Sequence, residues 1–208
     1  MYIGEFVGKV ARDQLKKVLI LGESHYGEVT STESVVYCYW ENYAENTGRA
    51  RERSYRFFDY IVRTFGQDPE QHREDFWNKV YFGNYVDVPC GVRDARAQNA
   101  ITKNSEQYNQ SLFRFVKEEG IDCIFCFSRR VYQALPKLEG QDSTNLVDGT
   151  DAHRLEKCTY NPGQRENVNV MLDKPVTIFG LKHPSQGYSY RKYQDRVAQI
   201  IKEHGLSF

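Results

Sequence analysis

The chain has 208 residues, of which 40% are hydrophobic and 27% are charged, as is usual for a globular protein. This length can bury one sizeable core, so we expect a single domain over residues 1–208. Lysine plus arginine equals aspartate plus glutamate at 28 each. The overall charge therefore does not favour a nucleic-acid partner, although a local basic face can still contact DNA.

The longest apolar runs are much shorter than the ~18 residues that a membrane span needs. The N-terminal residues also lack the basic and apolar regions of a secretory signal. We therefore expect a cytoplasmic protein without a membrane partner.

Apolar runs predict four buried strands, and the segments between them have helical patterns. In chain order we expect a lead-in with a short helix (1–16), a strand (17–22), a helix (31–46), a helix (50–65), a short helix opened by Asp68 and Pro69, a strand (80–86), a loop (87–94), a helix (from 104 or 105 to 119), a strand (121–127), a helix capped by Ser128 (129–135), an irregular insertion with a short strand at most (139–172), a strand (176–180) and a final helix (189–204). This alternation predicts an α/β fold in three layers, with a mostly parallel, four-stranded central sheet between helices.

Two details of the pattern support these helices. In 50–65 an apolar stripe at helical spacing faces arginine and glutamate, and its members are Tyr55, Phe58, Ile61, Val62 and Phe65. Asp68 followed by Pro69 is a typical helix start, with aspartate as the N-cap and proline at the first helical position.

The chain has five cysteines: Cys38, Cys90, Cys123, Cys126 and Cys158. An odd number in a chain of this kind does not indicate a disulfide framework. Cys123 and Cys126 have the C-x-x-C spacing of metal and redox pairs, but they lie within an apolar strand. Buried thiols on that strand are the favoured interpretation, with a metal or redox pair as the alternative.

Polar residues follow three of the predicted strands. Gly22-Glu23-Ser24-His25-Tyr26 follows the first, Asn84 lies late in the second, and His183-Pro184-Ser185 follows the fourth. Each has an ordinary explanation as a solvated or capping residue. In a parallel sheet, however, these strand ends share one edge, where α/β proteins bind ligands. Their coincidence predicts a functional site.

With these motifs the chain resembles the uracil-DNA glycosylase superfamily, from about residue 17 to 204. Gly22-Glu-Ser-His-Tyr26 is similar to the family's first motif, and Tyr81-Phe-Gly-Asn84 with the loop to Arg93 is similar to its base-reading strand. Ile124–Ala134 is similar to the family's strand and Gly-x-x-Ala helix, with Ser128 for the glycine. His183-Pro184-Ser185 matches the His-Pro-Ser loop. The resemblance implies that family's fold and a hydrolase that removes a base from DNA during repair.

The resemblance also implies roles for these residues. His183 would donate a hydrogen bond to the charge that develops on the leaving base. Asn84 would read the Watson–Crick edge of a flipped uracil and so refuse cytosine, with Gly22 and Tyr26 forming part of the binding site. Ser185 would hold a phosphate, and Arg191 and Lys192 would contact the DNA backbone.

The chain departs from the family pattern at the first motif. Ser24 stands where the family usually has a water-orienting Asp or Asn, and His25 replaces a common proline. Glu23 is then the nearest carboxylate, so Glu23, Ser24 and His25 join His183 as candidate catalytic residues. The iron–sulfur branches place cysteines before the first motif, whereas the first cysteine here is Cys38. We therefore expect no iron–sulfur cluster, no other metal and no cofactor.

Three functions are compatible with the sequence. The first is a DNA glycosylase acting on uracil or another deaminated or damaged base, which Asn84, Tyr26 and His183 favour. The second is a protein of the same fold that binds a nucleotide or nucleic acid without cleaving it, which Ser24 and His25 favour. The third is an unrelated hydrolase using Glu23 and His25, which leaves Asn84 and the His-Pro-Ser loop unexplained.

Overall fold

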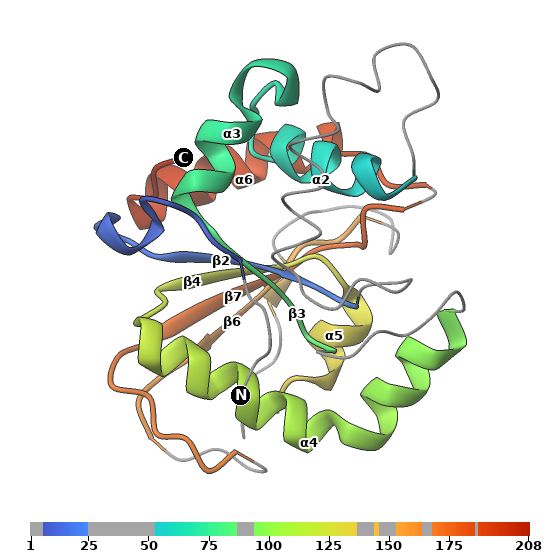
Figure 1. The fold of residues 1–208 in the computed structure, drawn as a ribbon, viewed down its shortest axis with the longest axis vertical. Coiled ribbons are helices and arrows are strands. Elements are labelled where there is room, and N and C mark those ends of the chain that lie inside the picture. The colour runs from blue at the N-terminus through green and yellow to red at the C-terminus, as the bar shows by residue number, and fades with distance from the viewer. Residues whose placement is uncertain are drawn as a thin grey trace.

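A computed structural model describes residues 6–24, 53–86, 94–136, 144–145, 153–163, 168–185 and 187–208. Within these ranges the chain forms one mixed sheet in the order β1-β3-β2-β4-β7-β6-β5 (Figure 1). Its strands are β1 (Phe6–Val7), β2 (Val18–Gly22), β3 (Tyr81–Asn84), β4 (Cys123–Cys126), β5 (Thr144–Asn145), β6 (Glu156–Tyr160) and β7 (Val176–Gly180).

The centre of the sheet consists of the four strands that the apolar runs predicted. β3, β2, β4 and β7 are neighbours in that order and all run parallel. Every residue of these strands is buried, as expected for strands covered on both faces. Their carboxyl ends therefore lie along one edge of the sheet.

The expectation of a four-stranded sheet was wrong, because three further strands extend it. β1 pairs antiparallel with β3 at one side, while β6 pairs antiparallel with β7 and β5 with β6 at the other. β6 lies inside the segment 139–172 that the sequence indicated as irregular. It has a half-exposed centre, so no continuous apolar run marks it.

Helices cover both faces of the sheet. α2 (Arg53–Thr64), α3 (Pro69–Lys79) and α6 (Arg191–His204) lie on one face, whereas α4 (Asp94–Glu119) and α5 (Arg129–Ala134) lie on the other (Figure 1). Two buried apolar clusters match these layers. One includes Ile20, Phe125 and Phe179, and the other includes Leu21, Ile124 and Ile178. Alternate residues of the same strands thus fill both layers.

Several local predictions are confirmed. The α2 stripe is buried at Phe58, Ile61, Val62 and Phe65. Asp68 caps α3, because its side chain accepts a hydrogen bond from the Glu70 amide. Ser128 caps α5 by accepting from the Val131 amide at 3.3 Å.

Two other local predictions were wrong. α4 begins at Asp94 rather than at 104 or 105, and the backbone of Asn104 is non-helical, with φ −124° and ψ 18°. The sequence signal for a helix start thus corresponds to a kink inside a longer helix. The lead-in contains β1 and a short 3₁₀ turn, η1 (Ala11–Asp13), instead of an α-helix. The predicted helix at 31–46 lies outside the described residues.

Cys123 and Cys126 are buried thiols in separate clusters on opposite faces of the sheet. Burial raises the pKa of each to about 12, so neither is a reactive thiolate. The buried-thiol interpretation is therefore confirmed. The described residues contain no group of three or more potential metal ligands, and among them no helix is long and apolar enough to cross a membrane.

Candidate functional site

The carboxyl edge of the parallel strands brings together side chains from the first, second and fourth predicted strands. Gly22 at the end of β2 is paired in register with Asn84 at the end of β3. The chain then leaves β7 at Gly180 and reaches His183 three residues later. The polar strand ends that the sequence singled out thus lie along one sheet edge, with β4 between β2 and β7.

The Asn84 amide lies directly over the backbone of Gly22. A Cβ atom at residue 22 would collide with the Asn84 Oδ1 atom, so glycine is required for this approach. The Asn84 side chain is only 5% exposed, and the described residues include no hydrogen-bond partner for its amide. Asn84 therefore presents an oriented amide whose donor and acceptor no other described residue occupies.

Phe57 of α2 connects this amide to the last motif. Its Cζ atom lies 3.5 Å from the position of a Cβ on Gly22. Its ring centroid lies 5.3 Å from that of His183, with the planes tilted by 41°. Gly22, Asn84, Phe57 and His183 thus form one cluster, in which the amide and the aromatic ring both approach Gly22 and the ring contacts the imidazole.

The loop that carries His183 is held by a tight turn and by tyrosines. The Ser185 amide donates to the His183 carbonyl at 2.7 Å, and the Tyr188 amide donates to the Ser185 carbonyl at 3.0 Å. The buried Tyr188 hydroxyl lies 2.6 Å from Thr64 Oγ1 on α2, and its ring stacks on Tyr193 of α6 at 5.3 Å. These contacts fix the loop against the helices that carry Phe57 and Arg191.

Glu23 points away from this cluster and is fully engaged. Its Oε2 accepts from Ser128 Oγ at 2.6 Å and from Arg130 Nε at 3.2 Å, and its Oε1 accepts from Arg130 Nη2 at 2.6 Å. The side chain is only 3% exposed. With both oxygens occupied, Glu23 ties the first loop to the start of α5, and the geometry gives no support to a role as a free general base.

The other residues of the first motif are only partly described. The Ser24 hydroxyl is buried, with no hydrogen-bond partner among the described residues. A neutral hydroxyl of this kind can orient a water or a ligand but cannot act as a base. His25 and Tyr26 lie outside the described residues, so their predicted roles stay predictions.

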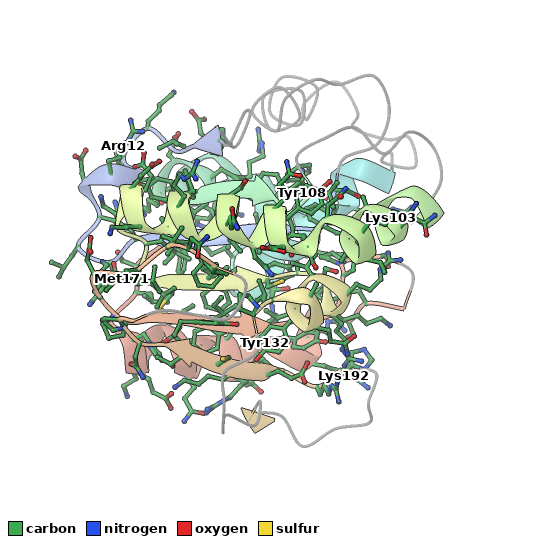
Figure 2. All side chains as sticks on the ribbon, turned by 90° about the horizontal axis from the view of Figure 1, so that it is seen from below. Arg12, Lys103, Tyr108, Tyr132, Met171 and Lys192 are labelled. Carbon is green, nitrogen blue, oxygen red and sulfur yellow. The ribbon has the colours of Figure 1, made fainter. Side chains whose placement is uncertain are left out.

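Ser185, Arg191 and Lys192 are exposed next to this edge of the sheet. The Ser185 hydroxyl is 3.5 Å from the His183 carbonyl, which is too long to hold it firmly. Arg191 lies over the Tyr190 ring at 5.8 Å from its centroid. Lys192 lies at the opposite end of the molecule from Arg12 (Figure 2). All three side chains are accessible to a polyanion.

Phe57 and Arg130 are site residues that the sequence reasoning missed. Phe57 lies beside the predicted apolar stripe of α2, and the only signal in the sequence was an aromatic residue next to that stripe. Arg130 follows Ser128 in the third motif, but its partner Glu23 is 107 positions away. No local pattern could have shown that contact.

An open pocket of about 250 Å³ lies between α4 and α5, on the far side of the Glu23–Arg130 pair. It borders the Asn104 kink and is lined by Ile101, Thr102, Ser105, Arg130, Gln133 and Ala134. Arg130 therefore contacts both this pocket and the buried carboxylate of the first loop.

Comparison of the chain with models of known protein families finds no match, and a search of curated proteins finds none either. The functional conclusion therefore depends on the geometry of the site.

Proposed function

We propose that this protein is a DNA glycosylase that hydrolyses the N-glycosidic bond of uracil or another deaminated or damaged base, and that its fold is of the uracil-DNA glycosylase type. The observation that carries the proposal is the cluster at the sheet edge, in which Asn84 and Phe57 both approach Gly22 and the Phe57 ring contacts His183. An amide, an aromatic ring and an imidazole are the groups needed to read, stack and polarise a flipped base.

In this proposal Asn84 distinguishes uracil from cytosine. Its amide has one donor and one acceptor, which complement adjacent groups on the Watson–Crick edge of uracil. The same groups on cytosine have the opposite polarity. Because Asn84 is buried and held over Gly22, turning the amide to suit cytosine would disturb the packing at this strand end.

His183 stabilises the leaving group. As the bond between the sugar and the base breaks, positive charge develops on the sugar and negative charge on the base; water then adds to the sugar carbon, and the proton it loses neutralises the departing base anion. A ring N–H of His183 donates to the base oxygen that gains charge, as a preorganised donor does in an oxyanion hole. Phe57 supplies the surface on which the base stacks.

The test is strand scission at a single uracil. End-labelled single- and double-stranded oligonucleotides are incubated with the full chain and then treated with alkali, which cleaves at abasic sites. We expect scission that is lost in Asn84→Ala and lowered by ~10²–10³-fold in His183→Ala. The exposed residues Asn99 and His72 provide matched controls, Asn99→Ala and His72→Ala. Equal loss in variant and control would contradict the assigned roles.

A second candidate is a protein that binds a nucleotide or nucleic acid without cleaving it. The observation that favours it is the occupation of both Glu23 oxygens, together with a serine at position 24, because neither residue can then activate water. This candidate predicts oligonucleotide binding with no release of any base. Binding that Asn84→Ala weakens, without scission by the parent protein, would favour it over the glycosylase.

A further inference from the structure

Four basic side chains from four separate segments gather beside the sheet edge. Arg129 begins α5, Lys182 follows β7, and Lys192 lies in the first turn of α6. His153 precedes β6, whose residue Glu156 is paired with Gly180 of β7. Because these strands are antiparallel, continuing their register outward brings residue 153 alongside the residues that follow β7.

Several contacts support this arrangement. The His153 and Tyr193 ring centroids are 6.0 Å apart. Lys182 Nζ donates to the Gly187 carbonyl at 3.1 Å, which turns its ammonium back across the loop. The strands before Arg129 and Lys182 are also neighbours, since the Leu181 amide donates to the Cys126 carbonyl at 2.8 Å. Lys192 lies at the same end of the molecule as α5 (Figure 2).

The cluster contains buried hydrogen-bond donors without partners. Arg129 Nε and Nη2 are both buried and unbonded among the described residues, as is each ring nitrogen of His153. Among the described residues Arg129, Lys182 and Lys192 form no ion pair, and the nearby Glu156 is paired with Arg154. Arg129 is partly exposed, but burying two guanidinium nitrogens without hydrogen bonds is costly, so a ligand that accepts hydrogen bonds from them would be stabilising.

Charge repulsion within the cluster is evident at His153. Burial lowers the pKa of His153, and the charges of Lys192, Lys182 and Arg129 lower it further. The backbone carbonyl of Gly187 weakly raises the pKa of His153 and so opposes the lowering. It makes no well-aligned hydrogen bond with the ring. An anion placed among these groups would relieve the repulsion.

We propose that Arg129, His153, Lys182 and Lys192 form a binding site for a phosphate group. Arginine suits this ligand because its planar fork donates two parallel hydrogen bonds to phosphate oxygens, and the lysines contribute charge. The observations that support this phosphate site do not assume that the protein excises bases. Lys182 is the residue before His183, so under the proposed function the phosphate would belong to the nucleotide strand beside the flipped base.

The first test measures phosphate binding to the full chain by calorimetry and by the shift of the unfolding temperature. Inorganic phosphate is compared with chloride at equal ionic strength. We expect one phosphate per chain and a rise in unfolding temperature that chloride does not reproduce. Arg129→Gln should weaken phosphate binding about 10- to 100-fold, because it removes charged hydrogen bonds. The matched control is Arg114→Gln, at an exposed residue of α4, and it should leave binding unchanged.

The unfolding temperature without phosphate distinguishes an arginine that binds a ligand from one that stabilises the fold. Because Arg129 Nε and Nη2 are buried without a partner among the described residues, Arg129→Gln should unfold at the same temperature as the parent protein or higher when phosphate is absent. Lys182→Gln, with the exposed Lys202→Gln as its control, repeats the binding test at an independent position. A phosphate effect equal to that of chloride, or one that survives both Arg129→Gln and Lys182→Gln, would overturn the site.

The source of the phosphate is resolved by two further probes. A 5′-phosphorylated dinucleotide presents a monoester, whereas an unphosphorylated tetranucleotide presents only diesters. Competition with inorganic phosphate by the first alone indicates a terminal phosphate, and competition by both indicates a nucleic-acid backbone. If neither competes, the ligand is free phosphate. Each result is independent of the scission assay, so the two proposals can fail separately.

Discussion

At the residue scale, the site depends on which polar side chains are free and which are satisfied. Asn84 and Glu23 are both buried, with exposed fractions of 5% and 3%. The Asn84 amide has no partner among the described residues, whereas three donor atoms occupy the Glu23 carboxylate. The two residues therefore have different roles, although the sequence suggested functional roles for both.

The role of Glu23 is testable through stability. Glu23→Gln keeps the size of the side chain but removes the charge opposite Arg130, so we expect the free energy of unfolding to fall by about 1–3 kcal/mol. The loss is smaller than for a fully buried pair because the Arg130 side chain is 37% exposed. Urea unfolding measures it, with the exposed Glu118→Gln as the control.

A general base would give a different outcome at position 23. If Glu23 activated water, Glu23→Gln would lower the excision rate by ~10²-fold or more at a temperature where the variant is fully folded. A positioning residue predicts a loss of less than about tenfold under those conditions. A large loss of activity without any loss of stability would contradict our assignment.

At the element scale, Ser128 has two roles at the start of α5. Its hydroxyl accepts from the Val131 amide and donates to Glu23 Oε2 at 2.6 Å. One oxygen thus caps the helix and fixes the first loop of the site. At the same edge of the sheet, Gly180 at the end of β7 admits the ring of Tyr132, since a Cβ there would lie 2.6 Å from a ring carbon. Both contacts hold α5 close to the sheet.

Two helix caps can therefore be compared directly. Asp68→Ala removes a cap and a long, exposed ion pair with Arg63 at 3.7 Å, which contributes little, and should lower the free energy of unfolding by ~1 kcal/mol. Ser128→Ala removes a cap and a hydrogen bond to a carboxylate, so its cost should be about 2–3 kcal/mol. Chemical denaturation of both variants provides the comparison. Equal losses would mean that the Ser128–Glu23 contact contributes nothing.

The elements that the sequence predicted well are those whose signal is local. The four central strands are continuous apolar runs, and Asp68 and Ser128 are recognisable caps. The sequence allowed a short strand within 139–172 but did not locate β6, because Lys157 and Cys158 are only partly buried and break the apolar pattern. Arg130 and Phe57 gain their roles from partners distant in sequence, so only the packed fold brings them to the site.

At the scale of the whole molecule, one carboxylate joins three parts of the sheet at the edge opposite the site. Asp122 accepts from the Lys17 amide before β2 at 2.9 Å and from Lys174 Nζ before β7 at 2.7 Å, and it leads directly into β4. Burial alone would raise the pKa of Asp122, but the hydrogen bonds from Lys174 and Lys17 outweigh it and lower the pKa.

This lowered pKa predicts how stability changes in acid. The stabilisation from Asp122 is present above the unfolded-state pKa of about 3.9 and is lost as pH falls through the lower folded-state pKa. The difference in unfolding free energy between the parent protein and Asp122→Asn should therefore be about 1–2 kcal/mol at pH 7 and shrink toward pH 3. Urea titrations at both pH values measure this, with the exposed Asp195→Asn as control. A difference independent of pH would contradict the role of the charge.

We propose above all that the site at the sheet edge opposite Asp122 excises a base from DNA. Its most direct test measures free base released from uracil-containing DNA, and from DNA with other deaminated bases, by the parent protein and by His183→Ala. We predict base release by the parent and a ~10²–10³-fold slower rate in the folded variant. If no base is released from any of these substrates, or if His183→Ala releases it at the parental rate, the proposed glycosylase is contradicted.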